Sequence, residues 1–511
     1  MQSRPFAFPR ALFSSHSLAA RRSPSISAGS SRQYVKMATQ TQLQRRAQKT
    51  EGTIADVFTT LGVQSTFSAL PPRFARLKRN VLAEFGTTPE ALVEAWNQVL
   101  QELEVRSQEI EKLRGDIIPR VSYEDIKNGL SEGQVHAIKR TGVVIITGAV
   151  PKEEALRWKD SVKEYISANP VRGFPANNIQ AYELYNTKSQ ILARTHPAVL
   201  RSQKALLGLW HSSTPAAVDF STPIIYFDRL RIRTPGDKSF TLGPHIDGGS
   251  VERWEDETFR KVFGKILSGE GKWAEYDAFD ASSRMNAKQD LYNTPNQCSI
   301  LRCWQGWTSM STTGAGEGTL RVLPMLSLAT AYIILRPFFR PIVSLSALRG
   351  SQSLAAEDWE LDLDSSSFPG SVPGKTQELN QSTHPHLRLD KTMVSVPTIQ
   401  PGDQVYWHCD VVHAVEAVHG GKEDSSVLYI PAVPLSLKNA TYLRDQRINF
   451  LYGYPAPDFP GGEGESNFNG RATTQDIASR EGRQALGFEP FEPSPSSNSR
   501  LVDEANKILF G

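Results

Sequence analysis

The feature of this sequence that most constrains its fold is a series of short β-branched and aromatic runs between about residues 220 and 435. Gly, Pro or Asp bounds each run, as is typical of short strands joined by turns. The runs are IIYFDRLRIRT, NQCSILRCWQGWTSM, GTLRVLP, TMVSVP, DQVYWH and SSVLYIPAV. Such a series predicts an antiparallel sandwich or barrel.

Helices are expected before this β region and inside it. Apolar residues recur every three or four positions through 71–114, and residues 122–166 predict a helix, a short strand and a second helix. Two insertions interrupt the strands: residues 251–297 are amphipathic and charged, which favours helix, whereas residues 336–390 read as mostly polar loop. The chain is therefore predicted to be an α+β protein.

The same patterns divide the chain into four segments. Residues 1–36 are a candidate targeting segment, 37–121 a helical extension, 122–453 the β domain with its two insertions, and 454–511 a Pro- and Gly-rich tail with short helices. With 511 residues, of which 39% are hydrophobic, the chain can bury a sizeable core.

Charge is unevenly distributed along the chain. Residues 1–50 hold nine Lys or Arg and no Asp or Glu, which leaves 48 basic against 54 acidic residues in the remainder, a net charge of −6. A mildly acidic body offers little electrostatic attraction for nucleic acid. We therefore expect a small-molecule substrate rather than a nucleic-acid partner.

Residues 1–36 are rich in Arg and Ser and contain no acidic residue. This composition predicts a mitochondrial transit peptide, the alternative being a plain tail without a targeting role. Met37 could act as a second start, which would give a cytosolic form. No run reaches the roughly 18 apolar residues that a membrane span requires.

The three cysteines contain no C-x-x-C pair. Neither a disulfide framework nor a structural zinc knuckle is therefore indicated. This cysteine usage is typical of a reducing compartment.

The stretch GPHIDGGS, at 243–250, places His245 and Asp247 two residues apart between glycine-bearing turns. In a strand, residues i and i+2 point to the same side, so both side chains can face one metal ion. A His-x-Asp tripeptide also arises by chance in a long chain, and HCD at 408–410 is a second copy. The surroundings must therefore distinguish the two.

A third ligand would have to come from a distant strand. The stretch PGDQVYWHCDVVHAV, at 401–415, offers one, because a Pro-Gly-Asp turn and an apolar strand lead to His413. Two imidazoles and one carboxylate suit a divalent transition metal. His245, Asp247 and His413 are the predicted ligands.

These motifs resemble those of the phytanoyl-CoA-hydroxylase-like branch of the Fe(II)/2-oxoglutarate-dependent dioxygenases. KRTGVVIITGAVPKEEAL (139–156) is similar to the family's opening element, and WTSMSTTGAGEGTLRVLP (307–324) to its middle strands. The resemblance implies a double-stranded β-helix, a jelly-roll or cupin-like core, with His413 as the distal ligand and His408 as a non-ligand. The whole chain is also similar to a family of fungal and bacterial proteins of unknown function with this fold.

The resemblance implies an oxidoreductase that uses Fe(II), 2-oxoglutarate and O2. In that chemistry 2-oxoglutarate is oxidised to succinate and a nearby C–H bond of a small organic molecule is hydroxylated. Trp307 lies at a position that contacts the co-substrate in such relatives. Related halogenases lack the carboxylate ligand, and because Asp247 is present, hydroxylation is favoured.

The resemblance also implies a basic residue shortly after the distal histidine, which pairs with the far carboxylate of 2-oxoglutarate. This chain has Ser425 and its neighbours there. Arg233 or Arg321 is expected to take that role from another strand, because guanidinium groups pair with carboxylates from several directions. Arg233 is preferred, with Ser425 and Trp307 completing the pocket.

A protein of another class is the alternative. The same β-barrel could be a non-catalytic or hydrolytic protein in which the three residues hold Zn(II) or nothing and the pocket only binds a ligand. The sequence predicts neither the oxidised substrate nor the oligomeric state.

Overall fold

The computed structural model describes residues 49–61, 70–215, 217–343, 354–493 and 498–511. The expected transit peptide, residues 1–36, lies outside the described residues. Residues 49–511 make up one unit, to which all of the structure below belongs.

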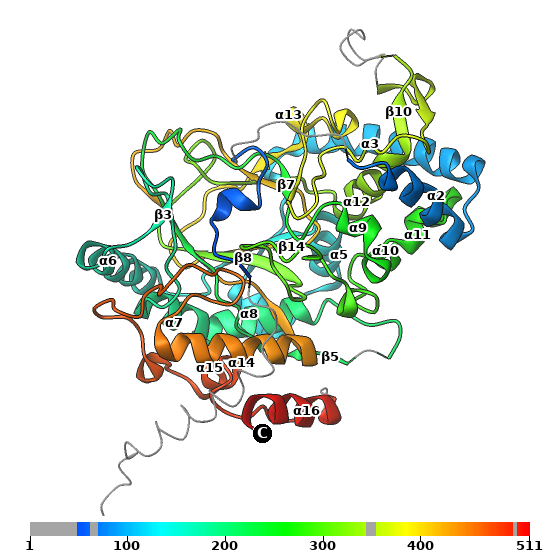
Figure 1. Cartoon of the computed structure of the whole chain (residues 1–511). Helices are drawn as coiled ribbons and strands as arrows, with labels where there is room; N and C mark the ends of the chain where they lie inside the picture. Colours follow the sequence, from blue (N-terminus) through cyan, green and yellow to red (C-terminus); the bar gives the residue numbers. More distant parts are fainter. Residues whose placement is uncertain (1–48, 62–69, 216, 344–353, 494–497) are drawn as a thin grey trace, which may run out of the picture. The chain divides into compact units, whose positions relative to one another are not determined.

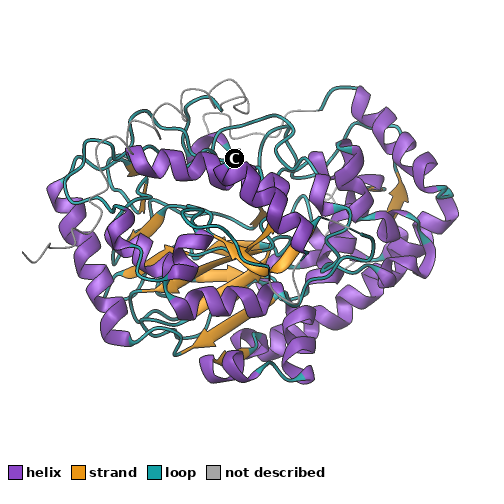
Figure 2. Cartoon of the chain, turned by 90° about the horizontal axis from the view of Figure 1, so that it is seen from below, coloured by secondary structure: helices purple, strands orange, loops and turns teal. Residues whose placement is uncertain are grey.

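The protein is α+β, as its sequence predicts, with strands gathered in the middle and helices around them (Figures 1 and 2). The larger sheet has eight strands, and neighbouring strands are antiparallel except for β1 and β2. In spatial order they are β1 (Arg120–Ser122), β2 (Val143–Thr147), β14 (Gln404–His408), β8 (Trp304–Ser309), β16 (Ser425–Tyr429), β6 (Leu230–Arg233), β4 (Ala181–Tyr182) and β3 (Gly173–Phe174).

A second sheet has five antiparallel strands. In spatial order they are β12 (Gln377–Glu378), β7 (His245–Ile246), β15 (His413–Val415), β9 (Leu320–Val322) and β13 (Val394–Ser395). The chain crosses repeatedly between the two sheets, because β6, β8, β14 and β16 belong to the first and β7, β9 and β15 to the second. Two further pairs are β5 (Val218–Ile224) with β17 (Val433–Ser436), and β10 (Phe339–Pro341) with β11 (Trp359–Leu361).

Most helices occupy the N-terminal region, the first insertion and the C-terminal region, and others lie between β9 and β13. The α-helices are α2 (Arg73–Phe85), α3 (Pro89–Leu113), α4 (Tyr123–Asn128), α5 (Glu132–Thr141), α6 (Lys152–Ala168), α7 (Lys188–Thr195), α8 (Pro197–Leu207), α9 (Glu252–Glu255), α10 (Glu257–Val262), α11 (Gly264–Leu267), α12 (Leu326–Leu335), α13 (Leu389–Thr392), α14 (Leu437–Tyr452), α15 (Arg480–Ala485) and α16 (Ser499–Phe510).

The helical pattern of residues 71–114 forms two helices because local signals interrupt it. Gly86 ends α2 in the left-handed conformation at φ 63°, which glycine adopts without steric cost. Thr88 then caps α3 by accepting a hydrogen bond from the Ala91 N–H, and Pro89 occupies its first turn.

The second insertion differs from the expected polar loop. Residues 336–390 contain β10, β11 and β12, and β12 pairs with β7 so that Glu378 lies opposite His245. The polar residues Gln377 and Glu378 show no apolar strand pattern in the sequence. They form a strand because their backbone groups pair with those of β7, and the side chains do not indicate such pairing.

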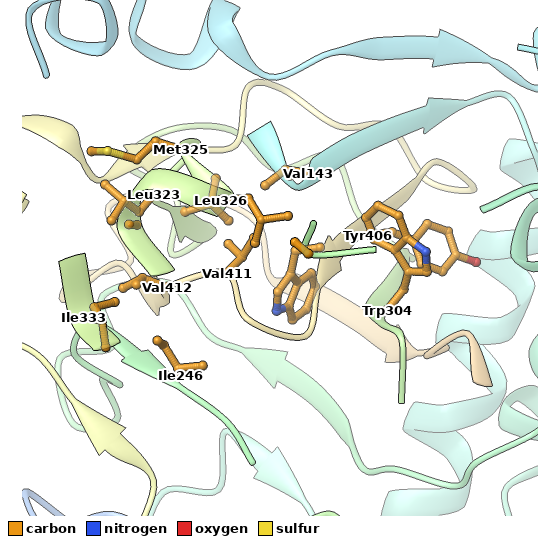
Figure 3. Close-up of a cluster of buried hydrophobic side chains, with 14 of the residues drawn as sticks. Val143, Ile246, Trp304, Leu323, Met325, Leu326, Ile333, Tyr406, Val411 and Val412 are labelled. Carbon is orange, nitrogen blue, oxygen red and sulfur yellow. The ribbon is translucent and has the colours of Figure 1, made fainter. Parts of the chain in front are cut away.

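Apolar residues next to the site residues belong to the main core. Figure 3 shows Ile246, Val411 and Val412 within a cluster of buried aliphatic and aromatic side chains. Ile333 of α12 belongs to the same cluster and is 1% exposed. Because side chains alternate along a strand, the burial of Ile246 in this cluster turns its neighbour His245 to the opposite face of β7.

Among the described residues, none of the helices combines the length and the apolar character needed to cross a membrane.

Candidate metal centre

Three side chains from two neighbouring strands converge. His245 lies on β7, Asp247 follows in the turn, and His413 lies on β15 as the backbone partner of His245. The His245 Nε2 atom is 3.9 Å from Asp247 Oδ1, and the His413 Nε2 atom is 3.7 Å from Asp247 Oδ2. One donor atom of each residue lies within 4.8 Å of the others, a spacing that can hold a metal ion.

Both imidazole rings are held from behind by the backbone. His245 Nδ1 is 2.7 Å from the Gly243 carbonyl oxygen, and His413 Nδ1 is 3.0 Å from the Val411 carbonyl oxygen. A proton on each Nδ1 satisfies these carbonyls and leaves Nε2 as the free lone pair. Metal-binding histidines are usually oriented in this way.

A glycine pair turns the chain away immediately after Asp247. Gly248 and Gly249 have φ angles of 84° and 81°, in the left-handed region that favours glycine. A Cβ atom on Gly249 would lie 2.5 Å from the Gln289 carbonyl oxygen. The glycines after the His-x-Asp motif therefore allow the tight turn that leads from β7 into α9.

The charge states suit a metal ion. Burial lowers the pKa of His413 to about 3, and the nearby His245 adds to the effect, so the His413 ring is neutral near pH 7. For Asp247, burial acts to raise the pKa, but His245, His413 and Arg302 outweigh it and hold the pKa below its usual value. A neutral imidazole and an ionised carboxylate are the forms that bind a metal.

The second His-x-Asp copy also brings three donor atoms together, from His408, Cys409 and Asp410. These atoms already have protein partners. His408 Nε2 lies 3.0 Å from the Ala278 carbonyl oxygen, and His408 Nδ1 accepts from the Asp410 N–H. Arg284 donates to Asp410 at 2.6 Å and lies 3.7 Å from Cys409 Sγ. This copy therefore forms a separate, internally bonded group.

A cavity of about 160 Å³ lies beside the three converging side chains. Trp307 and Ser425, both predicted from the sequence, line it. The aromatic side chains in its wall are Phe58, Tyr226, Phe240, Trp307, Trp407, Tyr429 and Phe459. A largely apolar wall with a few polar groups is typical of a small-molecule site.

The two arginines predicted to anchor a co-substrate do not line this cavity. Arg233 is fully buried, and its Nε donates to Asp237 at 2.8 Å while its other nitrogens donate to the backbone carbonyls of Glu416, Ala417 and Asp237. Arg321 donates to the Met393 carbonyl oxygen at 2.8 Å. Both guanidinium groups are therefore bonded within the protein itself.

The arginines that do line the cavity are Arg229, Arg231 and Arg302. Arg231 lies two residues before Arg233 on the same strand, so both face the same side of the sheet. The alternation Arg229, Arg231, Arg233 in DRLRIRT was the signal for a cationic strand face. The sequence could not say which of the three would be neutralised by Asp237.

Comparison with known proteins places the chain in a family. The family model described as Gig2-like matches residues 68–488. The chain belongs to the Gig2-like family. YbiU of Escherichia coli strain K12, described as an uncharacterized protein, is 31% identical over 432 residues, which are 81% of this chain and 95% of that protein.

Solved structures agree with this membership. The crystal structure of GlcNAc Inducible Gene 2, GIG2 (DUF1479), from Candida albicans matches with a TM-score of 0.77 at 31% identity, covering 87% of this chain and 96% of that one. A Salmonella typhimurium LT2 protein described as a candidate oxidoreductase matches with a TM-score of 0.68 at 28% identity, covering 83% and 99%. The predicted likeness to fungal and bacterial proteins is confirmed.

One wall of the cavity is formed by residues that precede, in the sequence, the segment matched by the Gig2-like model. Residues 49–61, which we call the N-terminal strap, place Ile54, Val57 and Phe58 in the cavity wall. The Phe58 ring meets the His245 ring edge-on, with centroids 4.9 Å apart. The expectation of a helical extension over 37–121 did not reveal this segment, which contains only the short 3-10 helix η2 (Ile54–Asp56).

Polar contacts hold the strap at both ends. The buried Lys49 ammonium lies 3.4 Å from Asp458 and 3.5 Å from Asp290. At the other end, the Glu378 carboxylate accepts from the Thr59 and Thr60 N–H groups. Because Glu378 lies on β12 as the backbone partner of His245, the strap is bonded to the strand next to the one that carries the first candidate ligand.

Proposed function

We propose that this Gig2-like protein is an Fe(II)/2-oxoglutarate-dependent oxygenase that hydroxylates a small organic molecule. The observation that carries the proposal is the convergence of two free imidazole Nε2 atoms and one carboxylate at His245, His413 and Asp247. If these three residues bind one side of Fe(II), three adjacent coordination positions remain open, which is enough for a bidentate 2-oxo acid and O2.

The strand order supports a double-stranded β-helix as the core of the proposed enzyme. From β6 to β9 and from β13 to β16, successive strands of these two sheets alternate between them, and two of the three candidate ligands, His245 and His413, lie on β7 and β15 of the smaller one. Ligands placed on paired strands are held more precisely than ligands on separate loops.

When bound, Fe(II) with 2-oxoglutarate and O2 would supply an oxidant for a C–H bond, with 2-oxoglutarate converted to succinate and carbon dioxide. The residues of the chain would bind and orient the reactants and keep bulk water away. The aromatic wall formed by Phe58, Trp307 and Trp407 is suited to excluding water.

We assign Arg231 to the distal carboxylate of 2-oxoglutarate. Arg231 lies opposite Val427 in the β6–β16 ladder, and Val427 lies opposite Ser309 of β8. All three line the cavity. Arg231 thus reaches the cavity from the strand next to β16, which in similar enzymes carries the basic residue.

The state of Arg231 supports this assignment. Its side chain is buried, its Nη2 donates only a long hydrogen bond of 3.4 Å to the Phe240 carbonyl oxygen, and its Nε has no hydrogen-bond partner among the described residues. Burial lowers the pKa of Arg231 to about 10, which still leaves it charged at neutral pH. A buried carboxylate without a cation would cost several kcal/mol, so a cation at this place is needed.

Metal content and succinate release together test the proposal. The protein would be purified anaerobically, its metal measured by mass spectrometry, and 2-oxoglutarate and O2 then added. We expect about one iron per chain and slow succinate release that requires both iron and 2-oxoglutarate, with none from His413→Ala. Tightly bound zinc without succinate release would favour the ligand-binding protein of the other class instead.

A further inference from the structure

The cavity carries more positive charge than a metal and its co-substrate require. Among the described residues, the charged side chains that line it are Asp228, Asp247, Arg229, Arg231 and Arg302. Three cations therefore face two anions. A divalent metal ion and a doubly charged 2-oxo acid cancel one another, so an excess of one positive charge remains for a further ligand.

Two of these arginines meet at one aspartate. Arg302 Nη1 lies 3.5 Å from Asp228 Oδ2, and Arg229 Nε lies 3.9 Å from Asp228 Oδ1. Arg302 Nη2 also lies 3.6 Å from Asp247 Oδ2. The alternating series Asp247, Arg302, Asp228, Arg229 leads from the candidate metal centre along the cavity wall.

Aromatic rings hold both guanidinium groups in place. The Arg229 guanidinium carbon lies 4.7 Å from the centre of the Phe459 ring, and that of Arg302 lies 5.7 Å from the centre of the Tyr226 ring. The two rings contact each other, with centroids 6.0 Å apart. Stacking fixes a guanidinium without using its N–H groups, so these remain available to a ligand.

Within the described part of the chain, the carboxylate contacts of these two guanidinium groups are 3.5 Å or longer, which exceeds an ordinary charge-assisted hydrogen bond. Arg229 is nonetheless only 8% exposed and lines the cavity. A buried arginine with unused donors beside a cavity is a strong site for an anion, because a charge-assisted hydrogen bond gains strength where water is scarce.

We propose that Arg229 and Arg302 bind a carboxylate group of the substrate, which makes the substrate a small organic acid. Asp228 neutralises one of the two arginines, so one net positive charge is left for a singly charged group. The apolar part of the acid would lie against Val57 and Phe58 of the N-terminal strap. Naming this ligand the substrate rests on the proposed function, whereas the carboxylate site itself does not.

Ligand-observed NMR on the full chain, freed of metal by a chelator, tests the site. The probes are two matched pairs, phenylacetate with phenylacetamide and hexanoate with hexanamide, which differ in charge and little in shape. We expect each acid to bind about tenfold more tightly than its amide, the effect of one charge-assisted hydrogen bond. Equal binding of acid and amide would overturn the proposal.

Three variants locate the site. Arg229→Met should abolish the preference for the acid, whereas Arg231→Met, which alters the residue assigned to the co-substrate, should keep it. Asp228→Asn should strengthen acid binding, because it removes the internal counter-charge of both arginines, and a folding defect could not produce that gain. If the preference survives in Arg229→Met or disappears only in Arg231→Met, the assignment is wrong.

The experiment separates this proposal from the proposed function. Acid binding in the metal-free protein needs neither iron nor 2-oxoglutarate, so it would persist if the protein proved not to be an oxygenase. Conversely, iron-dependent succinate release with no preference for acids would overturn only the substrate class.

Discussion

His245 and His413 are backbone partners on adjacent antiparallel strands, and their ring centroids lie 4.1 Å apart. Each ring is bound through Nδ1 to a carbonyl oxygen two residues before it. The two candidate ligands are therefore positioned by the sheet and by their own local backbone, and their separation does not depend on loop conformation.

This arrangement predicts different effects for two histidines only five positions apart. We expect His413→Ala to lose bound metal while keeping its fold, because it removes one candidate ligand from the cavity wall. His408→Ala should keep the metal but lose about 3 kcal/mol of stability. The His408 ring stacks on Trp210 with centroids 4.7 Å apart, and it is fully buried.

Two measurements on both variants and the unaltered protein check this prediction: metal content by mass spectrometry, and stability by thermal unfolding. If instead His408→Ala loses its bound metal and His413→Ala retains it, the second His-x-Asp copy is the metal site.

Arg231 and Arg233 give a second matched pair. Arg231→Met should raise the 2-oxoglutarate concentration needed for half-maximal binding to the iron-loaded protein by about tenfold or more, with iron content unchanged. Arg233→Met should instead lower stability by about 3–5 kcal/mol, because it leaves the buried Asp237 carboxylate without its partner. Anaerobic titration, followed by the absorption of the iron complex, measures the first effect and thermal unfolding the second.

Much of the site could be predicted from the sequence because its signals are local. His245 and Asp247 are only two residues apart, and the turn and strand before His413 identify it as their partner from a distant segment. The choice between His413 and His408 came from a family resemblance, and the bonds of His408 to Ala278 and Asp410 now give a physical reason for it.

The remaining features depend on contacts between segments that no local pattern encodes. Arg229, Arg231 and Arg233 alternate in the sequence and carry the same charge, and it is the return of the chain at Asp237 that pairs Arg233 with a buried carboxylate. The N-terminal strap is similar: nothing near Phe58 in the sequence indicates that it will lie against His245.

The strap predicts a third effect, on metal exchange. Phe58→Ala should speed the loss of bound metal to a chelator several-fold, because the Phe58 ring covers one edge of His245 and is only 4% exposed. Val105→Ala is a suitable control, since Val105 is 65% exposed on α3. Stopped-flow mixing with a coloured chelator measures the rates, and equal rates for all three proteins would mean that the strap does not cover the site.

For the targeting segment we propose mitochondrial import. A fusion of residues 1–50 to a fluorescent protein should enter mitochondria, because the segment is basic and contains no acidic residue. Replacing Arg4, Arg10, Arg21 and Arg22 with Gln should leave the fusion in the cytosol, as should starting it at Met37. If the unaltered fusion stays diffuse under fluorescence microscopy, the import proposal fails.

The last prediction concerns pH and Glu252, a fully buried carboxyl on α9. Burial raises its pKa from an ordinary value of 4.5 to about 7, although the Ser250 N–H donates to one oxygen at 2.7 Å. The folded chain therefore holds this proton more tightly than the unfolded chain. The resulting stability is complete below about pH 4.5 and is lost as the pH rises through about 7, an effect of roughly 3 kcal/mol at most.

Glu252→Gln isolates this contribution, because an amide of similar shape does not titrate. Thermal unfolding of both proteins between pH 5 and pH 8 should show the variant gaining stability relative to the unaltered protein as the pH rises. Most of the gain should fall between about pH 5 and pH 7, below the raised pKa, because there the folded chain keeps the proton that the unfolded chain has lost. A stability difference that stays constant over this range would mean that Glu252 is ionised at no extra cost in the folded protein, and that its burial is relieved by groups other than the Ser250 N–H.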